Sequence, residues 1–296
     1  MIDFVIMTDS CCDLPKEYIY SNKISFAMLP FSYNDKEYLD DFGQSKTQKQ
    51  FFDDLRAGAL PNTSQANAES FYNIFKPAAE LGLDIIYVGV SSGLSGTYNS
   101  ANIAKTSILE EFPSVQIHII DVLTASLGQG LMVMKAVEMK NEGNTAEEIV
   151  EEIKKDIPNL NTYITVEDLN FLKRGGRISN VAATLGLVLH IKPILTLNHE
   201  GRVIPVLKVR GRKKSITKLA EILKEKIKNP ASQTIAICHA DCAYEAVKLK
   251  EEILAKVKVK EVIIHYIGPV VGRFSGPGAL AVFFIGETRQ HHVVDV

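Results

Sequence analysis

The sequence reads Phe4-Val5-Ile6-Met7-Thr8-Asp9-Ser10-Cys11-Cys12-Asp13-Leu14-Pro15 near its start, and this stretch decides the fold class. Its first five residues form a short apolar run, which is typical of a buried strand. A polar loop follows directly, and Pro15 suits the first position of a helix. Asp9 and Ser10 either face a ligand at the carboxyl end of the strand or fix the loop. Asp13 is expected to cap the helix.

The same alternation of strands and helices continues through the first half of the chain. Further strands are predicted at 25–33, 84–90 and 115–120. Helices are predicted at 48–57, 68–81, 94–112 and 124–141, and Thr145 with Glu148 reads as a capping box that opens another. Strands that alternate with helices of this length predict a Rossmann-like parallel sheet covered on both faces.

The pattern changes after about residue 160. A hairpin is predicted where 194–197 and 202–207 flank the turn 198–201. Strands at 163–166, 234–238, 262–266 and 281–285 are mixed with helices at 215–227 and 244–257. We therefore expect two domains: an α/β domain at 1–160 and an α+β domain with a mixed sheet at 161–296.

Composition excludes several classes of protein. Of 296 residues, 46% are hydrophobic and 23% are charged, which is ordinary for a globular chain and excludes a disordered or fibrous one. The net charge is −2, and the basic cluster Arg210 to Lys214 is short enough to be a solvated helix start. No nucleic-acid partner is therefore expected.

No signal peptide or membrane span is predicted, so a cytoplasmic location is expected. The first seven residues carry no basic region, and Asp3 interrupts their apolar run.

The cysteine-containing segments Cys11-Cys12 and Cys238-His239-Ala240-Asp241-Cys242 lack the spacing of a zinc site. We expect no metal and no cofactor. Gly276-Pro277-Gly278-Ala279-Leu280-Ala281 resembles a dinucleotide fingerprint, but without a strand-helix-strand unit it predicts a tight turn.

Two hydroxyl-rich segments precede helices and could bind an anion. They are Thr63-Ser64-Gln65 and Ser91-Ser92-Gly93-Leu94-Ser95-Gly96-Thr97. Free backbone N–H groups and the helix dipole favour negative charge at such positions. Helix capping explains each segment taken alone. Two of them in one half of the chain favour a site for a carboxylate.

The second segment also fits an alternative function. Gly89-Val90-Ser91-Ser92-Gly93 matches the Gly-x-Ser-x-Gly nucleophile elbow of serine esterases. A triad could be formed by Ser91, Asp121 and either His239 or His265. No His-Gly-Gly-Gly oxyanion segment precedes the elbow, which disfavours an esterase.

Taken together, these segments resemble the DegV family of bacterial lipid-binding proteins over nearly the whole chain. The matching pieces are Thr8-Asp9-Ser10 with Asp13-Leu14-Pro15, Thr63-Ser64-Gln65, Ser91 to Thr97, Gly175-Gly176-Arg177-Ile178 and Ile191-Lys192-Pro193-Ile194. The resemblance implies a non-catalytic protein with a long-chain fatty acid, such as palmitate, between two domains. It implies that Thr63 and Ser95 hold the carboxylate, and Ser92 belongs to the same expected site.

The resemblance also implies a partner. Some members of the family present the bound acid to a separate ATP-dependent fatty-acid kinase, and an arginine that falls on Arg210 takes part in docking it. Arg177 matches the family pattern and is expected to serve the same docking. One departure is clear: the family histidine that touches the carboxylate falls on Phe274, in Pro269-Val270-Val271-Gly272-Arg273-Phe274. The neighbouring Arg273 is the expected substitute for that contact.

Overall fold

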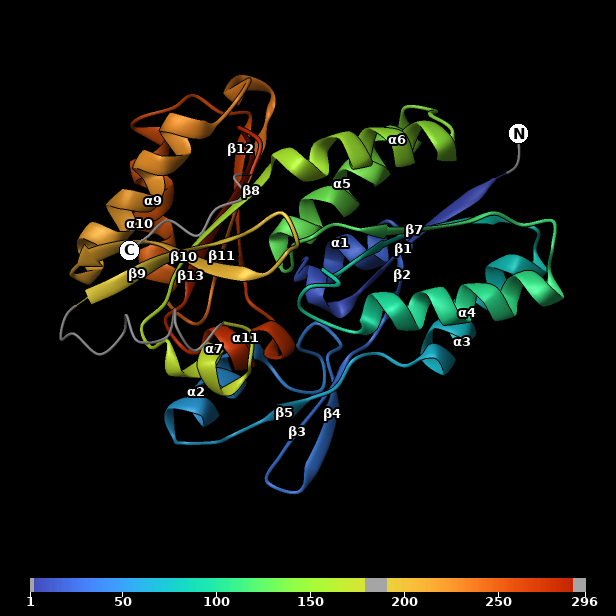
Figure 1. Cartoon of the computed structure of the whole chain (residues 1–296), viewed down its shortest axis with the longest axis horizontal. Coiled ribbons are helices and arrows are strands. Elements are labelled where there is room, and N and C mark those ends of the chain that lie inside the picture. Colours follow the sequence, from blue (N-terminus) through green and yellow to red (C-terminus); the bar gives the residue numbers. More distant parts are fainter. Residues whose placement is uncertain (1–2, 179–190, 290–296) are drawn as a thin grey trace.

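A computed structural model describes residues 3–178 and 191–289, and two sheets dominate its fold (Figure 1). The first sheet is parallel, with the strand order β2-β1-β6-β7. Its strands are β1 (Phe4–Asp9), β2 (Ser25–Ala27), β6 (Asp84–Gly89) and β7 (Ile117–Asp121). The expectation of a parallel sheet in the first half of the chain is confirmed.

Helices cover both faces of this sheet, because successive strand side chains point to opposite faces. Met7 packs with α3 (Ala68–Glu80) and α4 (Thr97–Glu111). Phe4 and Ile6 belong to the core that contains α5 (Leu127–Asn141) and α6 (Ala146–Asp156). The predicted capping box of Thr145 and Glu148 is present at the start of α6.

The second sheet is mixed, with the strand order β10-β9-β8-β13-β11-β12. Its strands are β8 (Leu160–Thr165), β9 (Ile191–Leu197), β10 (Val203–Arg210), β11 (Thr234–His239), β12 (Glu261–Tyr266) and β13 (Leu280–Ile285). The helices α9 (Arg212–Lys226) and α10 (Ala243–Leu254) cover one face. The predicted hairpin is confirmed, since β9 and β10 pair antiparallel.

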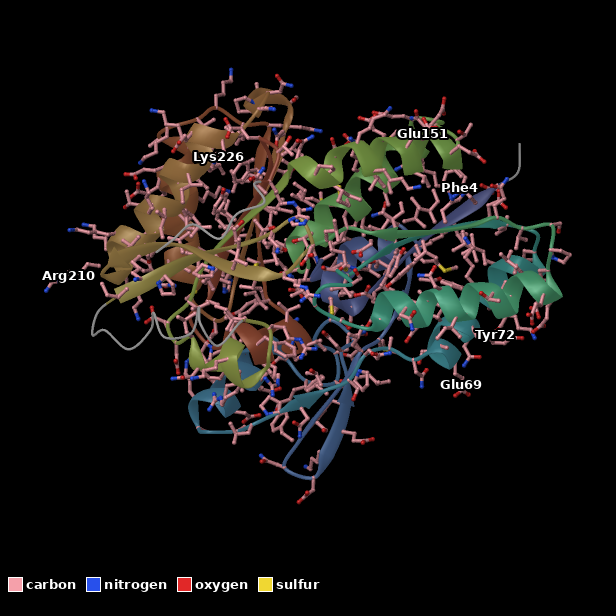
Figure 2. The ribbon with its side chains drawn as sticks, viewed as in Figure 1. Phe4, Glu69, Tyr72, Glu151, Arg210 and Lys226 are labelled. Atoms are coloured by element: carbon pink, nitrogen blue, oxygen red, sulfur yellow. The ribbon has the colours of Figure 1, made fainter. Side chains whose placement is uncertain are left out.

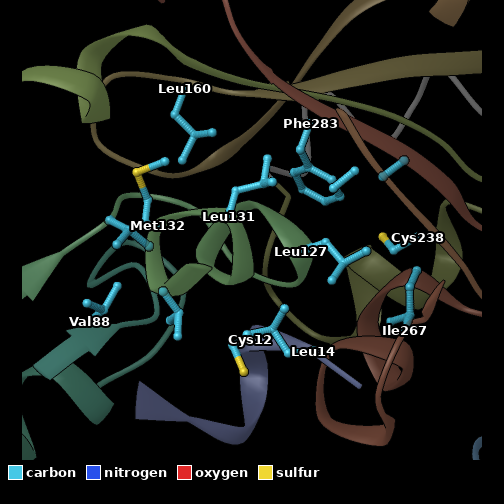
Figure 3. Close-up of a cluster of buried hydrophobic side chains, with 14 of the residues drawn as sticks. Cys12, Leu14, Val88, Leu127, Leu131, Met132, Leu160, Cys238, Ile267 and Phe283 are labelled. Carbon is cyan, nitrogen blue, oxygen red and sulfur yellow. The ribbon is translucent and has the colours of Figure 1, made fainter. Parts of the chain in front are cut away.

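Helix α5 fills the space between the two sheets (Figure 3). Leu131 and Met132 lie between Val88 of the first sheet and Leu160 of the second, and all four side chains are buried. The first half of α5, Leu127 to Val133, is therefore buried on every face, which explains why it carries no charged residue.

A smaller unit lies beside the two large sheets (Figure 1). It contains the three-stranded sheet β4-β3-β5 and three short helices. Its elements are β3 (Pro30–Tyr33), β4 (Lys36–Leu39), β5 (Asn62–Thr63), α2 (Gln48–Arg56), α7 (Asn170–Arg174) and α11 (Pro269–Ser275). Because α7 and α11 come from the second half of the chain, this unit joins the two halves. The division at residue 160 stays a prediction.

Three local expectations are wrong. The predicted strand 25–33 is divided between two sheets, because the Leu29 amide donates to Ser10 Oγ instead of continuing the ladder. The predicted helices at 94 and 124 begin three residues later, at Thr97 and Leu127. The sequence also gave no signal for α11, which is only seven residues long.

Asp13 does not cap the first helix, α1 (Lys16–Ser21). Asp13 has a backbone φ of +51°, and its carboxylate accepts hydrogen bonds from the hydroxyl of Ser126 and the amide of Gly268. The side chain of Asp13 therefore ties three distant segments together.

Gly276 and Gly278 both have positive φ in the turn between α11 and β13, as expected for a turn. None of the helices within residues 3–178 and 191–289 is long and apolar enough to cross a membrane.

Candidate functional site

A cavity of about 430 Å³ lies between the two sheets. Its wall is mostly aliphatic and aromatic, and it includes Val90 and Leu94 from the first half of the chain and Ile164, Val270 and Phe283 from the second. Ligand pockets in proteins usually have volumes of about 300–1,000 Å³ and walls of this kind. The cavity is therefore suited to an elongated apolar ligand.

Both hydroxyl-rich segments reach this cavity. Thr63, at the end of β5, and Ser95, just before α4, are among its lining residues, and both are half-buried. The segments touch each other: a Cβ on Gly96 would overlap the side-chain amide of Gln65. Gln65 Nε2 also donates to Ser100 Oγ at 2.9 Å, inside the first turns of α4. The fold thus brings together two segments that are about thirty residues apart in the sequence.

The hydroxyl of Ser95 bonds to Thr97, the first residue of helix α4. Ser95 Oγ lies 2.9 Å from Thr97 Oγ1 and accepts a hydrogen bond from the Thr97 amide at 3.3 Å. Gly96 occupies the cap position and offers no side chain to the helix. The next N–H groups of the first turn have no partner within the helix, as in any α-helix. This end of the cavity therefore carries the positive end of a fifteen-residue helix dipole.

Arginine side chains surround the aromatic ring of Phe274, which lines the cavity. The guanidinium of Arg177 lies 4.5 Å from the ring centroid, and that of Arg273 lies 4.8 Å away. Burial lowers the pKa of both arginines, and Arg273 is also affected by the charges of Arg177 and Arg174. Within 3–178 and 191–289, none of the three forms an ion pair with a carboxylate. Their uncompensated charge favours an anion at this end.

Arg177 also fastens the loop that carries Ser95. Its Nε donates to the Leu94 carbonyl at 3.1 Å, and its Nη1 donates to the Gly175 carbonyl at 2.7 Å. Arg177 lines the cavity, so the structure places it at the candidate site. The partner-docking role expected of it stays a prediction.

The other expected site residues lie elsewhere. Ser92 is exposed, and its amide donates to Asp121. Arg273 lies outside the cavity wall, and its Nε donates to the Pro61 carbonyl at 3.0 Å. Arg210 ends β10, where it pairs with Ile191, and its side chain points outward at the edge of the second sheet (Figure 2). None of these three side chains faces the cavity, and the contact roles expected of Ser92 and Arg273 stay predictions.

Asp9, at the end of β1, fixes the loop that follows and does not line the cavity. Asp9 is buried and accepts hydrogen bonds from Tyr87 Oη at 2.6 Å and the Val90 amide at 3.0 Å. Gln129 Nε2 also donates to it, at 3.0 Å. Desolvation raises the pKa of Asp9, while these hydrogen bonds oppose that rise. Of the two roles considered for Asp9, fixing the loop is the one that its contacts support.

The alternative catalytic triad is not assembled. Ser91 is buried and donates its hydroxyl to the Gly201 carbonyl at 3.0 Å. Asp121 accepts from the amides of Ser92 and Leu123. His239 Nδ1 accepts from the Cys242 amide, and His265 Nδ1 lies 3.0 Å from the Asp13 carbonyl. Each candidate thus has a structural partner of its own.

Sequence reasoning missed several polar residues of the cavity wall, among them Cys11, Ser126, Thr162, Cys238 and Ser275. Ser126 is a non-glycine residue with φ +57°, and its hydroxyl donates to buried Asp13. Desolvation raises the pKa of the Cys238 thiol above its ordinary value, so the thiol stays protonated. Ser275 directly follows the segment that ends at Phe274, and that adjacency was the only available signal for it. No cluster of metal-binding side chains occurs in the described part of the chain.

The fold and the cavity define a class of α/β proteins in which two sheets enclose one apolar chamber. The sequence model described as "Uncharacterised protein, DegV family" matches residues 3–287, and the chain belongs to the DegV family. A DegV domain-containing protein of Clostridium perfringens is 43% identical over 290 residues, which cover 98% of this chain and all of that protein.

Solved structures of the family superpose closely on this chain. One, described as showing fatty acid binding of a DegV family protein from Thermus thermophilus, has a TM-score of 0.88 and 29% sequence identity, and covers 97% of this chain and 100% of that one. Another, described as a stearic acid-binding protein from Eubacterium ventriosum, has a TM-score of 0.84 and 25% identity, and covers 95% and 98%. The two-domain α/β architecture expected from the sequence is confirmed by these neighbours.

Proposed function

We propose that this protein binds one long-chain fatty acid, such as palmitate, with the carboxylate at Thr63 and Ser95 and the tail in the cavity. One observation carries the proposal: an apolar cavity ends where two hydroxyl-bearing segments meet at the N-terminus of α4. The fatty acids bound by neighbouring structures of the family support it.

The tail supplies most of the affinity. Burial of one methylene group contributes about 0.8 kcal/mol, so a chain of about fifteen contributes on the order of 10 kcal/mol before the cost of association. The wall provides matching surface, since residues such as Val90, Ile164 and Phe283 present only carbon atoms. A saturated or monounsaturated acyl chain fits this chemistry.

The head supplies orientation. A carboxylate left unpaired in a buried site costs several kcal/mol, so donors must meet it. Thr63 and Ser95 offer hydroxyls, the first turn of α4 offers backbone N–H groups, and Arg177 contributes positive charge nearby. The acid is therefore expected to bind as the anion, head toward α4.

The experiment that tests this function is mass spectrometry of small molecules released by denaturing the purified protein. We expect one C14–C18 fatty acid per chain. If none is released, the delipidated protein is titrated with palmitate. A chain that carries no lipid and takes up none would contradict the proposal.

We also propose that the protein presents its ligand to a separate ATP-dependent kinase, with Arg210 in the docking surface. Arg210 is exposed and lies outside the cavity, so its loss should leave ligand binding intact. With a kinase subunit present, Arg210→Ala should lower the rate of acyl-phosphate formation at unchanged palmitate affinity. Lys224→Ala, which removes an exposed charge from α9, is the control and should keep the full rate. Equal rates for all three proteins would exclude Arg210 from docking.

A further inference from the structure

Ser275 has an unusual hydroxyl for a buried residue. The residue is 9% exposed, and its Oγ has no hydrogen-bond partner in the described part of the chain. A buried polar group without a partner is uncommon and costs stability, which calls for a specific explanation. Ser275 also lines the cavity, so the free hydroxyl has access to a ligand there.

Three other hydroxyls of the cavity wall have hydroxyl or carboxyl partners within the protein. Ser95 Oγ lies 2.9 Å from Thr97 Oγ1, and Ser126 donates to Asp13. Thr162 Oγ1 lies 3.0 Å from Thr124 Oγ1. A helical serine commonly bonds to the carbonyl four residues earlier, which here belongs to Val271. Ser275 makes no such bond, so its donor is available.

The position of Ser275 identifies the part of a ligand that it would meet. It ends α11, and the two residues before it contact both arms of the head-group site. Arg273 Nε donates to the Pro61 carbonyl, two residues before Thr63. Phe274 packs under Arg177, whose Nε donates to the Leu94 carbonyl, next to Ser95. The last turn of α11 therefore lies at the end of the cavity where Thr63 and Ser95 lie.

We propose that Ser275 donates a hydrogen bond to the carboxylate of the bound fatty acid, as a third hydroxyl besides Thr63 and Ser95. This inference rests on the proposed function. Phe274 has no donor, and the Nε of Arg273 is engaged by a backbone carbonyl outside the cavity. An ionised acceptor makes a stronger hydrogen bond than a neutral one. Ser275 therefore favours a fatty acid over a neutral lipid of equal length.

The test compares Ser275→Ala with the wild type by titration with palmitate and with hexadecanol. We expect the affinity of the variant for palmitate to fall about tenfold, as for the loss of one hydrogen bond to a charged group, and that for hexadecanol to fall less than threefold. Thr165→Val is the matched control. Thr165 Oγ1 is also buried and unpartnered, but Thr165 does not line the cavity, so both affinities should stay unchanged.

Two further variants separate hydrogen bonding from shape. Ser275→Thr keeps the hydroxyl and should restore palmitate affinity. Ser275→Cys fills the same space with a weak donor and should show the loss seen with alanine, so it replaces alanine if that variant fails to fold. Unchanged palmitate affinity in a folded Ser275→Ala or Ser275→Cys protein would overturn the inference. Equal losses for palmitate and hexadecanol would also overturn it.

Failure of the proposed function would look different. A wild-type protein that binds neither lipid would contradict fatty-acid binding itself. A wild type that binds palmitate, together with Ser275 variants that bind it equally well, would contradict only the role of Ser275.

Discussion

Ser95 shows how one residue can serve the fold and the site together. Its backbone amide donates to the Ser91 carbonyl, and its hydroxyl accepts from the Thr97 amide, so it connects the loop to the first residue of helix α4. The same hydroxyl lines the cavity. A hydroxyl oxygen accepts with its lone pairs and donates with its single proton, so these roles do not compete.

Removal of the Ser95 hydroxyl should therefore lower the affinity for a charged ligand more than the affinity for an apolar one. In Ser95→Ala we expect palmitate affinity to fall about tenfold, while affinity for the length-matched alkane stays nearly the same, because the alkane makes no use of a donor. Calorimetric titration of both ligands measures the difference. Ser107→Ala is the control, since Ser107 Oγ bonds to the Ile103 carbonyl of its own helix and Ser107 does not line the cavity. Equal losses for acid and alkane would remove Ser95 from the head-group site.

At the scale of elements, two buried carboxyl groups lie at the start of the short helix α11. Asp13 accepts a hydrogen bond from the Gly268 amide at 2.9 Å, just before α11 begins. A Cβ on Gly268 would lie 2.6 Å from Asp13 Oδ1 and 3.1 Å from Asp40 Oδ2, so both carboxyls face the same point. Burial raises the pKa of Asp13 to about 7 and raises that of Asp40 as well. Two titratable groups with raised pKa values therefore lie at the start of the helix that carries Phe274 and Ser275.

The raised pKa of Asp13 predicts a pH dependence of stability. Between pH 4 and about pH 7 the folded protein holds a proton that the unfolded chain has lost, so the Asp13 contribution to the free energy of unfolding falls as pH rises, by about 1.4 kcal/mol per pH unit at most. His239 acts in the opposite direction, because burial lowers its pKa to about 4. The effect of Asp13 must therefore be measured as a difference between proteins.

Asp13→Asn isolates this effect. The variant has no charge to bury, so its stability relative to the wild type should increase between pH 5 and pH 8. Thermal unfolding at several pH values measures the difference, and Asp53→Asn, an exposed carboxylate on α2, is the control. A constant difference between Asp13→Asn and the wild type across this range would show that Asp13 does not titrate there.

At the scale of the whole molecule, direct backbone contact joins the two halves around the cavity. A Cβ on Gly93 would overlap the backbone carbonyl of Glu200, in the turn between β9 and β10. Ser91 Oγ bonds to Gly201 in the same turn. On the other side, Arg56 of α2 lies 2.5 Å from Asp241, in the loop after β11. The cavity therefore exists only when both halves are docked.

Gly93→Ala should disturb this docking. A backbone carbonyl cannot move aside cheaply, so we expect a loss of stability on the order of 2 kcal/mol, together with weaker palmitate binding. Gly96→Ala is the matched control in the same loop, because its Cβ would meet only the flexible end of Gln65. Thermal unfolding of both variants should show the larger decrease for Gly93→Ala. A larger decrease for Gly96→Ala would contradict this account of the interface.

Much of the architecture could be predicted from local patterns. Phe4 to Thr8 and 84–90 are apolar runs of strand length, and Thr145 with Glu148 marks a helix start, because these signals depend on neighbours in the sequence. The strand predicted at 25–33 was wrong because the competing partner of Leu29 is Ser10, nineteen residues away. Asp13 was misassigned for the same reason, since its partners are Ser126 and Gly268.

The sequence by itself therefore determined the parallel and mixed sheets and the two hydroxyl-rich segments before helices, since period, capping and turn chemistry are local. Only the tertiary structure decided that Thr63 and Ser95 share one cavity and that the Ser91 hydroxyl bonds to the Gly201 carbonyl. It also decided that Ser275 lines that cavity with a hydroxyl that has no partner among the described residues. Those facts depend on which distant segments pack together and on which polar atoms packing leaves without a partner. No local pattern records either property.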